Sequence, residues 1–384
     1  MRIGIIAHLK YPISEPFAGG LEMHTYLLAS QLRKRGHDVV VFASTRSDPE
    51  LGLEALCDQT SLDAFGRKEE ENAEFFREHH AYLSLMNRLR LSDFDVIHNN
   101  SLHYLPVVLA DALQMPVLTS LHTPPFALLE SALRIAGNGN ARFVAVSDAI
   151  MQQWSPITPI AATIANGIDL SGFSFRGQPA EDPYAIWYGR IVAEKGLHLA
   201  MDAAELLGIP LRFAGPVSDR VYFDKEIVPR LNSSTTYCGH LAHRELARVI
   251  GGARVFLCTP CWQEPYGLVV AESLACGVPV AAFAMGGIPE ILDPLSGVLA
   301  TPGDVRSLAD AARRAQGLAR TDCRRRAEAV CNAEVMVDGY EDAYLKAIRS
   351  HSAVDTETPA ALMQAGIAAS LDHVVHPGGG ARST

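Results

Sequence analysis

Short apolar runs alternate with longer segments of helical spacing from the first residues of the chain onward. Residues 2–8 (RIGIIAH) form a compact apolar run, which is typical of a strand buried on both faces. Over residues 21–36 apolar positions recur at helical spacing, and the segment ends in basic residues and a glycine, as helices do. Residues 38–44 form the next apolar run. A strand, a helix and a strand in this order predict a parallel sheet.

The same alternation continues through two successive series of segments. In the first series, residues 61–91 are predicted to form a polar loop and then a helix, and further strands are predicted at 96–100, 116–123, 142–147 and 162–169. In the second series, strands with helices between them are predicted at 184–190, 211–215, 235–240, 254–260 and 278–283. The sequence therefore predicts an α/β fold with two Rossmann-like, doubly wound parallel-sheet domains.

Changes of composition suggest where these domains begin and end. Residues 1–169 form the first domain, and the loop-rich residues 170–183 form a linker. Residues 184–333 form the second domain, and residues 334–350 form a last amphipathic helix. Residues 351–384 are small and polar and end in a Gly-rich stretch, so we expect a largely disordered tail, with a weak helix at residues 359–371 as the alternative.

The bulk composition excludes several classes of protein. A chain of 384 residues that is 48% hydrophobic can build the cores of two domains. A formal net charge of −10 argues against nucleic-acid binding. No apolar run reaches the roughly 18 residues of a membrane span, and the first apolar run lacks a signal-peptide cleavage site. We expect a cytoplasmic protein. Three interpretations of residues 61–91 stay open. They form a lid over a ligand, a helix that contacts the inner face of a membrane, or a plain surface helix.

Two short motifs could suggest a metal, but their positions argue against it. Cys258 and Cys261 form a C-x-x-C without a second pair of ligands nearby, and the pair comes too late in the chain for a redox motif. Asp93 and Asp95 form a D-x-D that precedes a strand, which places it at the amino edge of the sheet. We therefore expect neither a metal site nor a cofactor, and we interpret the seven cysteines as structural thiols.

Ligands of doubly wound sheets bind beyond the carboxyl ends of the strands, so the residues that follow each strand are the candidates for ligand binding. Gly19 and Gly20 lie between the first strand and its helix, where backbone N–H groups can approach a phosphate. The G-x-G-x-x-G dinucleotide fingerprint is absent, and an ordinary tight turn is the alternative. Arg190 and Lys195 flank the loop after the first strand of the second domain, where two cations suit a diphosphate; a salt-bridged surface loop is the alternative.

Two glutamates stand in an otherwise apolar segment of the second domain. Glu264 lies in the loop at the carboxyl end of a strand, and Glu272 lies on the helix that follows, with seven residues between them. Residues 256–285 contain no lysine or arginine that could form an ion pair locally. Because buried carboxylates are costly unless they are satisfied, and because they accept well from vicinal hydroxyls, the pair predicts binding of a sugar or another polyol.

Further candidates lie at other strand ends. Gly286 and Gly287 follow a strand and precede a helix, so we expect their N–H groups to face the crevice, with a tight turn as the alternative. His98 and His122 lie toward the carboxyl ends of strands in the first domain. His122 is the better candidate for a substrate contact, and a satisfied core histidine is the alternative for both.

Taken in order along the chain, these motifs resemble those of one family. They are Gly19-Gly20, Asn166-Gly167-Ile168-Asp169, Gly189-Arg190, Glu194-Lys195-Gly196, the pair Glu264 and Glu272, and Gly286-Gly287-Ile288-Pro289-Glu290. The chain resembles a retaining glycosyltransferase of family 4 with the GT-B fold, in which the two domains face each other across a cleft. The resemblance covers roughly residues 1–350, and its most specific part is the segment around the two glutamates.

The resemblance implies a role for each motif. The second domain would bind a nucleoside-diphosphate sugar, and the acceptor, a glycan, a lipid-linked saccharide or a small molecule, would face the first. Arg190 and Lys195 would hold the diphosphate without a metal, Glu272 the ribose hydroxyls, and Glu264 the sugar hydroxyls, with His122 near the sugar. The other donor-binding residues would be Gly19, Gly20, Gly215, Tyr266, Gly267, Leu268, Val269, Gly286 and Gly287.

The resemblance also implies transfer on the same face of the sugar, without a protein nucleophile, with the leaving phosphate taking the acceptor proton. A uridine base is favoured from its frequency in the family, and guanosine comes next. Two alternatives stay open at this point, a nucleotide-sugar 2-epimerase and a non-catalytic nucleotide-sugar-binding protein.

Overall fold

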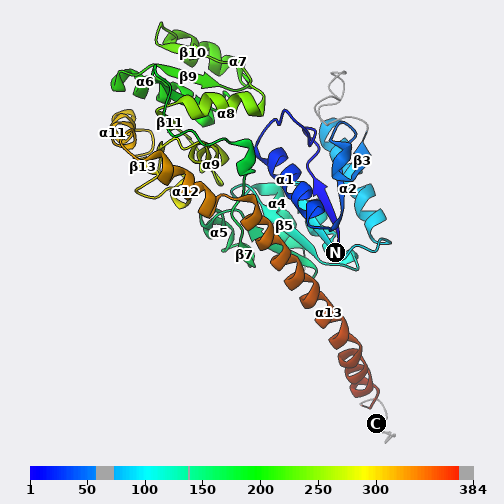
Figure 1. The fold of residues 1–384 in the computed structure, drawn as a ribbon. Helices are drawn as coiled ribbons and strands as arrows, with labels where there is room; N and C mark the ends of the chain where they lie inside the picture. The colour runs from blue at the N-terminus through cyan, green and yellow to red at the C-terminus, as the bar shows by residue number, and fades with distance from the viewer. Residues whose placement is uncertain (58–72, 137–138, 372–384) are drawn as a thin grey trace, which may run out of the picture.

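The computed structural model describes residues 1–57, 73–136 and 139–371, and Figure 1 shows its two α/β units with a long C-terminal helix. Within these residues the first sheet has the strand order β3-β2-β1-β4-β5-β6-β7. Its strands are β1 (Arg2–Ala7), β2 (Asp38–Ser44), β3 (Leu53–Cys57), β4 (Val96–Asn100), β5 (Val117–Leu121), β6 (Ala141–Ala145) and β7 (Ala162–Thr163). Every pairing in this sheet is parallel, as the sequence predicts.

The second sheet has the order β10-β9-β8-β11-β12-β13 and is also parallel throughout. Its strands are β8 (Ala185–Tyr188), β9 (Leu211–Ala214), β10 (Thr235–Tyr237), β11 (Val255–Cys258), β12 (Val280–Phe283) and β13 (Gly297–Ala300). The strand order reverses at β1 and β4 in the first sheet and at β8 and β11 in the second. The loops that follow these four strands are therefore where a ligand crevice is expected.

The helices fill the connections between the strands. In the first unit they are α1 (Gly20–Lys34), α2 (Ala73–Leu89), α3 (Leu105–Val108), α4 (Ala127–Ile135) and α5 (Asp148–Trp154). In the second unit they are α6 (Leu197–Leu207), α7 (Arg220–Tyr222), α8 (His243–Gly252), α9 (Leu268–Ala275), α10 (Ile288–Ile291), α11 (Val305–Ala315) and α12 (Arg320–Val330). None of the described helices, including α13 (Ala333–Leu371), combines the length and apolar composition needed to cross a membrane.

Two edge strands, β3 and β13, were not predicted. Each pairs on one side only, and each has partly exposed positions, so neither reads as the continuous apolar run of a strand covered on both faces. The predicted loop at residues 61–72 lies outside the described residues, and the helix predicted after it is α2.

The chain passes between the two units twice, and the two passes are hydrogen-bonded to each other. The Ile168 N–H donates to the carbonyl of Cys331 at 2.8 Å, and the Ala333 N–H donates to the carbonyl of Ile168 at 3.1 Å. A Cβ atom at Gly167 would lie 2.5 Å from the Cα of Ala333, so only glycine allows the two passes to approach this closely.

The predicted linker at residues 170–183 packs on the second unit over part of its length. Phe173 is buried with its ring centroid 4.5 Å from that of His243 on α8. The Ala180 N–H donates to the carbonyl of Gly252 at 2.9 Å. These contacts attach this part of the linker to the second unit.

The last helix, α13, crosses from the second unit to the first and packs against its sheet. Tyr340 and Tyr344 are fully buried there, and the Tyr344 hydroxyl lies 2.6 Å from Nδ1 of His98 on β4. Arg35 forms ion pairs with Glu334, Asp338 and Glu341 of this helix.

The helix continues to Leu371, so it replaces the expected disorder at residues 351–358 and includes residues 359–371, where a weak helix was the alternative. Residues 351–371 contain six alanines, which have high helix propensity, and they extend a helix that is already nucleated. Figure 1 shows it projecting beyond the body of the protein. The rest of the predicted tail, residues 372–384, lies outside the described residues.

Candidate functional site

A cleft of about 1270 Å³ lies at the carboxyl ends of the strands and is lined by both units. Most residues predicted for the site lie on its surface, although they come from distant parts of the sequence. These are Gly19, Gly20, His122, Arg190, Lys195, Gly215, Glu264, Tyr266, Gly267, Leu268, Val269 and Glu272.

Lys195 and Glu264 form an ion pair in the wall of the second unit. Lys195 Nζ lies 2.6 Å from Glu264 Oε2, and the indole N–H of Trp262 donates to the same oxygen at 3.0 Å. The side chains of Lys195 and Glu264 keep 23% and 16% of their exposure. Both bonds use Oε2, so Glu264 is fixed in place while its Oε1 is left for a ligand.

Arg190 follows β8 and provides the second cation of the cleft. Its guanidinium lies 3.1 Å from Glu194, and both side chains are exposed over about two-fifths of their surface. Lys195 and Arg190 therefore place two positive charges on one loop.

Glu272 is the most unusual carboxyl group of the cleft. It is 7% exposed and forms no ion pair with a described residue. Burial raises its pKa to about 8, and the Tyr188 hydroxyl lowers it in part. That hydroxyl is itself held by the carbonyl of Val269 at 2.5 Å. A carboxyl group kept on a cleft surface at this cost indicates a ligand that hydrogen-bonds to it.

The start of α9 faces the cleft between these acidic residues. Gly267 precedes the helix with a φ of 110°, and the first N–H groups of a helix have no partner within it. A Cβ atom at Gly20 would lie 2.9 Å from Leu268, so the start of α1 in the first unit touches the start of α9 in the second. The two glycine-flanked helix starts thus close one side of the cleft.

Gly215 lines the cleft beside the end of β8. It has a φ of 136°, and a Cβ atom there would overlap the carbonyl group of Gly189. Any side chain at Gly215 would push the Arg190 loop away from the sheet.

Gly286 and Gly287 lie behind the cleft surface, which corrects the prediction that their N–H groups face it. The Gly286 N–H donates to the side chain of Gln263 at 3.1 Å, and the Gly287 N–H donates to the carbonyl of Glu264 at 2.8 Å. These two bonds hold the loop that carries Glu264. The sequence pattern of strand, turn and helix predicts the position of these two N–H groups. It does not show that the loop with Gln263 and Glu264 accepts their hydrogen bonds.

Replacing Gly286 with alanine is expected to disturb Glu264 directly. The new Cβ atom would overlap the Glu264 backbone, so we expect a loss of about 3 kcal/mol or more in unfolding free energy and about a 100-fold loss of activity. Gly303→Ala is the matched control, because Gly303 also has a positive φ but has open space around it. It should lose only about 1 kcal/mol and keep full activity. Equal losses in the two variants would contradict the supporting role of Gly286.

The same loop also joins the two units. Glu290, at the end of the Gly-Gly motif, accepts hydrogen bonds from the N–H groups of Asp148 and Ala149 at 2.9 and 2.8 Å. The Ser147 hydroxyl donates to the carbonyl of Pro265 at 2.6 Å. The start of α5 in the first unit is thus attached to the loop that carries Glu264 in the second.

Two of the buried histidines of the first unit, His122 and His98, are the ones predicted from the sequence. His122 lines the cleft with 9% exposure, and its Nε2 lies 3.0 Å from Asn100 Oδ1. Burial, together with the charges of nearby histidines, lowers its pKa well below the ordinary value. His98 is fully buried between Ser120 and Tyr344 and does not line the cleft. His122 can therefore contact a ligand as a neutral group, and His98 is a satisfied core residue.

Neither the D-x-D motif at residues 93–95 nor the C-x-x-C motif at residues 258–261 is part of a group of metal-ligating side chains among the described residues. Asp93 and Asp95 both bind Arg2 at the amino edge of the first sheet, through its side chain and its N–H respectively. Cys258 and Cys261 are free thiols. Within the described part of the chain, no group of three or more metal-ligating side chains is assembled.

The structure places in the cleft lining a glutamate of the first unit that the sequence does not single out, together with Asn166 of the family motif. Glu22 is buried on α1, and its Oε1 lies 2.6 Å from Nε2 of His8. Burial alone would raise the pKa of Glu22, but His8 and Arg190 bring it below the ordinary value. Asn166 is buried with its Oδ1 unpaired among the described residues. An acidic residue is common in the first turn of a helix, so the local sequence around Glu22 does not predict its contact with His8.

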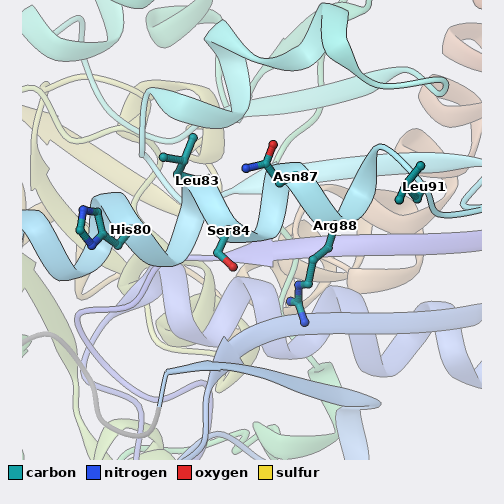
Figure 2. Close-up of a pocket in the computed structure, with 6 residues that line it drawn as sticks. All are labelled: His80, Leu83, Ser84, Asn87, Arg88 and Leu91. Carbon is teal, nitrogen blue, oxygen red and sulfur yellow. The ribbon is translucent and has the colours of Figure 1, made fainter.

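A second hollow of about 500 Å³ lies on the outward side of α2 (Figure 2). It is lined by His80, Leu83, Ser84, Asn87, Arg88 and Leu91. These positions recur every three or four residues along one face of one helix, and no residue predicted for the site is among them. We interpret it as a shallow depression between side chains on the surface of α2.

Comparison with known proteins defines the class of this fold and site. Residues 18–171 match the family described as "Glycosyltransferase Family 4", and residues 173–329 match "Glycosyl transferases group 1". The fold is GT-B, as in the Anabaena protein Alr3699/HepE solved in complex with UDP and glucose. That structure superposes with a TM-score of 0.70 at 16% identity and covers 90% of this chain and all of its own. The chain belongs to the glycosyltransferase family 4 and is a glycosyltransferase.

Two curated relatives align over most of their length. A glycogen synthase from Mycobacterium tuberculosis is 25% identical over an alignment of 339 residues that covers 77% of this chain and 82% of the relative. A phosphatidyl-myo-inositol mannosyltransferase from Propionibacterium freudenreichii is 25% identical over an alignment of 345 residues that covers 82% of this chain and 85% of the relative.

Proposed function

We propose that the protein is a retaining, metal-independent glycosyltransferase that acts in the cytoplasm. It moves a sugar from a nucleoside diphosphate, UDP in first place and GDP in second, to an acceptor hydroxyl of a glycan, a lipid-linked saccharide or a small molecule. The observation that carries the proposal is the cleft surface on which buried, unpaired Glu272 stands with Lys195, Arg190 and Glu264. Two carboxyl groups and two cations suit a ligand with hydroxyl groups at both ends of a diphosphate.

The cations act on the leaving group. Negative charge grows on the diphosphate as it departs from the anomeric carbon, so groups already in place around it lower the barrier. Lys195 is held by Glu264 and keeps further N–H donors for the phosphate. Arg190 and the N–H groups at the start of α9 provide further hydrogen-bond donors to the diphosphate. Gly19 and Gly20 close over the diphosphate from the first unit.

The carboxyl groups position the two ends of the donor. Glu272 accepts from the ribose hydroxyls, which satisfies a group that is otherwise buried without an ionic partner. Glu264 accepts from the hydroxyls of the transferred sugar through Oε1. His122 lies on the opposite wall as a neutral ring and contacts the same sugar.

The reaction needs no protein nucleophile in this arrangement. The bond between the anomeric carbon and the phosphate oxygen breaks, and the acceptor oxygen forms its bond on the same face. The acceptor proton passes to the departing phosphate oxygen. The UDP and glucose bound to the Anabaena protein support uridine as the first base to test, and the names of the two relatives support a glycan or a lipid as acceptor.

Thermal stabilisation by nucleotides tests the proposal. We expect one of UDP, GDP and ADP to raise the melting temperature in the presence of EDTA, whereas NAD does not. At about 100 times its dissociation constant the ligand adds roughly 2.7 kcal/mol. The corresponding sugar nucleotide should then give a product whose anomeric configuration, read by proton NMR, matches that of the donor. A shift that requires Mg²⁺, an inverted product, or no shift with any nucleotide would each contradict the corresponding part of the proposal.

A further inference from the structure

The turn that follows β4 carries backbone strain at the cleft. Among the residues that the structure describes, Leu102 is the one non-glycine residue with a positive φ, 59°. Hydrogen bonds on both sides fix the turn, because Asn99 Oδ1 accepts from the Ser101 N–H at 3.1 Å and the Ser101 hydroxyl accepts from the His103 N–H at 3.1 Å. Strain of this kind persists where the surroundings determine the conformation, and it gathers at ligand sites. Leu102 and its neighbours line the cleft.

The turn directs an unused hydrogen-bond donor. The Leu105 N–H donates to His103 Nδ1 at 3.2 Å, so the proton of the neutral ring is on Nε2. Burial, together with the charge of His79, lowers the pKa of His103 to about 4, which keeps the ring neutral near pH 7. The ring is 9% exposed, and its centroid lies 4.4 Å from that of Tyr82. Nε2 is buried and has no partner among the described residues.

An unused acceptor stands on the neighbouring helix. Glu78 lies one turn before Tyr82 on the same face of α2, and its charge raises the pKa of the buried Tyr82. Its Oε1 is also buried without a described partner, and Glu78 lines the cleft. A donor on His103 and an acceptor on Glu78 thus flank one buried tyrosine ring. Unpaired buried polar atoms are rare in folded proteins, and these two belong to residues that line the same cleft, which indicates a ligand.

The surroundings of this pair are aromatic. Tyr104 stacks on His103 with a centroid distance of 4.8 Å, and its hydroxyl lies 2.9 Å from His79 Nδ1. Phe75, 41% exposed, lies next to His79 with a centroid distance of 5.9 Å. Pockets of this composition, aromatic walls with a few placed polar groups, suit a ligand with both C–H faces and hydroxyl groups.

We propose that Glu78 and His103 recognise the acceptor, and that the acceptor is an uncharged sugar or polyol. One hydroxyl of the acceptor accepts from Nε2–H of His103 and donates to Glu78 Oε1. This inference rests on the proposed function, and it concerns a recognition hydroxyl that is separate from the one that receives the sugar. A phosphate or carboxylate in this position would be repelled by Glu78, so the site also rejects anionic acceptors.

Paired acceptors test the inference. The rate of sugar transfer is measured with each acceptor at 100 mM. The neutral acceptors are glucose, mannose and myo-inositol, and the anionic ones are glucose 6-phosphate, mannose 6-phosphate and glucuronate. The donor is the sugar nucleotide that the protein hydrolyses when no acceptor is present. We expect transfer to at least one neutral compound, at least about tenfold faster than to its anionic counterpart. Faster transfer to the anionic members would overturn the inference. So would donor hydrolysis without transfer to any neutral compound. Absence of both donor hydrolysis and nucleotide binding would mark failure of the proposed function itself.

Variants then assign the effect to the two residues. His103→Phe should raise the acceptor KM about tenfold, with donor hydrolysis and nucleotide stabilisation unchanged, and His103→Gln should recover part of the loss because its amide can donate. Glu78→Gln should reduce the preference for neutral over anionic acceptors. His80→Phe, on the outward face of α2 in Figure 2, is the matched control and should change neither quantity. An acceptor KM that His103→Phe leaves unchanged would overturn the assignment.

Discussion

Replacing Lys195 with methionine is expected to lower kcat for sugar transfer by about 100- to 1000-fold, the effect of removing one preorganised donor to a developing negative charge. Lys195 is the cation that the structure fixes, because Glu264 holds its ammonium at 2.6 Å and Trp262 lies beside it. Initial rates at saturating donor give the change in kcat. Lys225→Met, which removes an exposed lysine of the same unit outside the cleft, is the control and should keep wild-type activity.

The same substitution also leaves the Glu264 carboxylate without its ion pair. We expect a loss of about 1–3 kcal/mol in unfolding free energy, and adding Glu264→Gln should restore part of this stability without restoring activity. This comparison separates the contribution to folding from the contribution to transfer. A double variant that regained wild-type kcat would show that the loss in Lys195→Met came from the unpaired Glu264 carboxylate and not from the missing cation.

The second large effect is expected for Glu272→Gln. A carboxylate that accepts from two ribose hydroxyls contributes charge-assisted hydrogen bonds, so the dissociation constant for the nucleoside diphosphate should rise about 10- to 100-fold. Isothermal titration calorimetry measures this directly. Glu205→Gln, at an exposed position on α6, should leave the affinity unchanged. A change of less than twofold in Glu272→Gln would exclude the ribose contact.

Glu272 should also make stability depend on pH in the ligand-free protein. Its pKa is 4.5 in the unfolded chain and is raised by burial to about 8 in the folded protein. Between these values the folded state holds a proton that the unfolded chain has released. The stabilising contribution is therefore complete below about pH 4.5 and is lost as the pH rises to about 8. Urea unfolding at pH 5 and pH 8 should show this loss in the wild type and a smaller one in Glu272→Gln. Parallel behaviour of the two proteins would mean that another group titrates.

The parts of the site that lie in one continuous segment could be predicted from the sequence. Glu264 and Glu272 stand in an apolar run without local cations, and this pattern predicts carboxyl groups whose partners come from elsewhere; Lys195 is one such partner, for Glu264. The rule that ligands bind at the carboxyl ends of parallel strands places Arg190 and Lys195 beside Glu264. Their loop follows β8, which is the neighbour of β11, and Glu264 follows β11. The strands that are covered on both faces could also be predicted, because such strands appear in the sequence as continuous apolar runs.

What could not be predicted depends on contacts between distant segments. The bond between His8 and Glu22, the contact of Gly20 with Leu268 and the attachment of α5 to Glu290 leave no trace in local spacing. Gly286 and Gly287 were placed at the correct end of a strand, but only the fold shows which loop uses their N–H groups. The strained turn at Leu102 was invisible too, because leucine gives no sign of a positive φ.

The packing of α13 on the first unit has a consequence for how the protein is made. Met336, Val337, Tyr340 and Tyr344 belong to the same buried cluster as Ile3 and Ile5 of β1. A ribosome that adds roughly 5–20 residues per second needs about 10 to 40 seconds to proceed from β7 to Tyr344. During that interval the face of the first sheet that α13 covers has no partner, while the whole second unit emerges. The first unit therefore completes its core only after its neighbour has been synthesised.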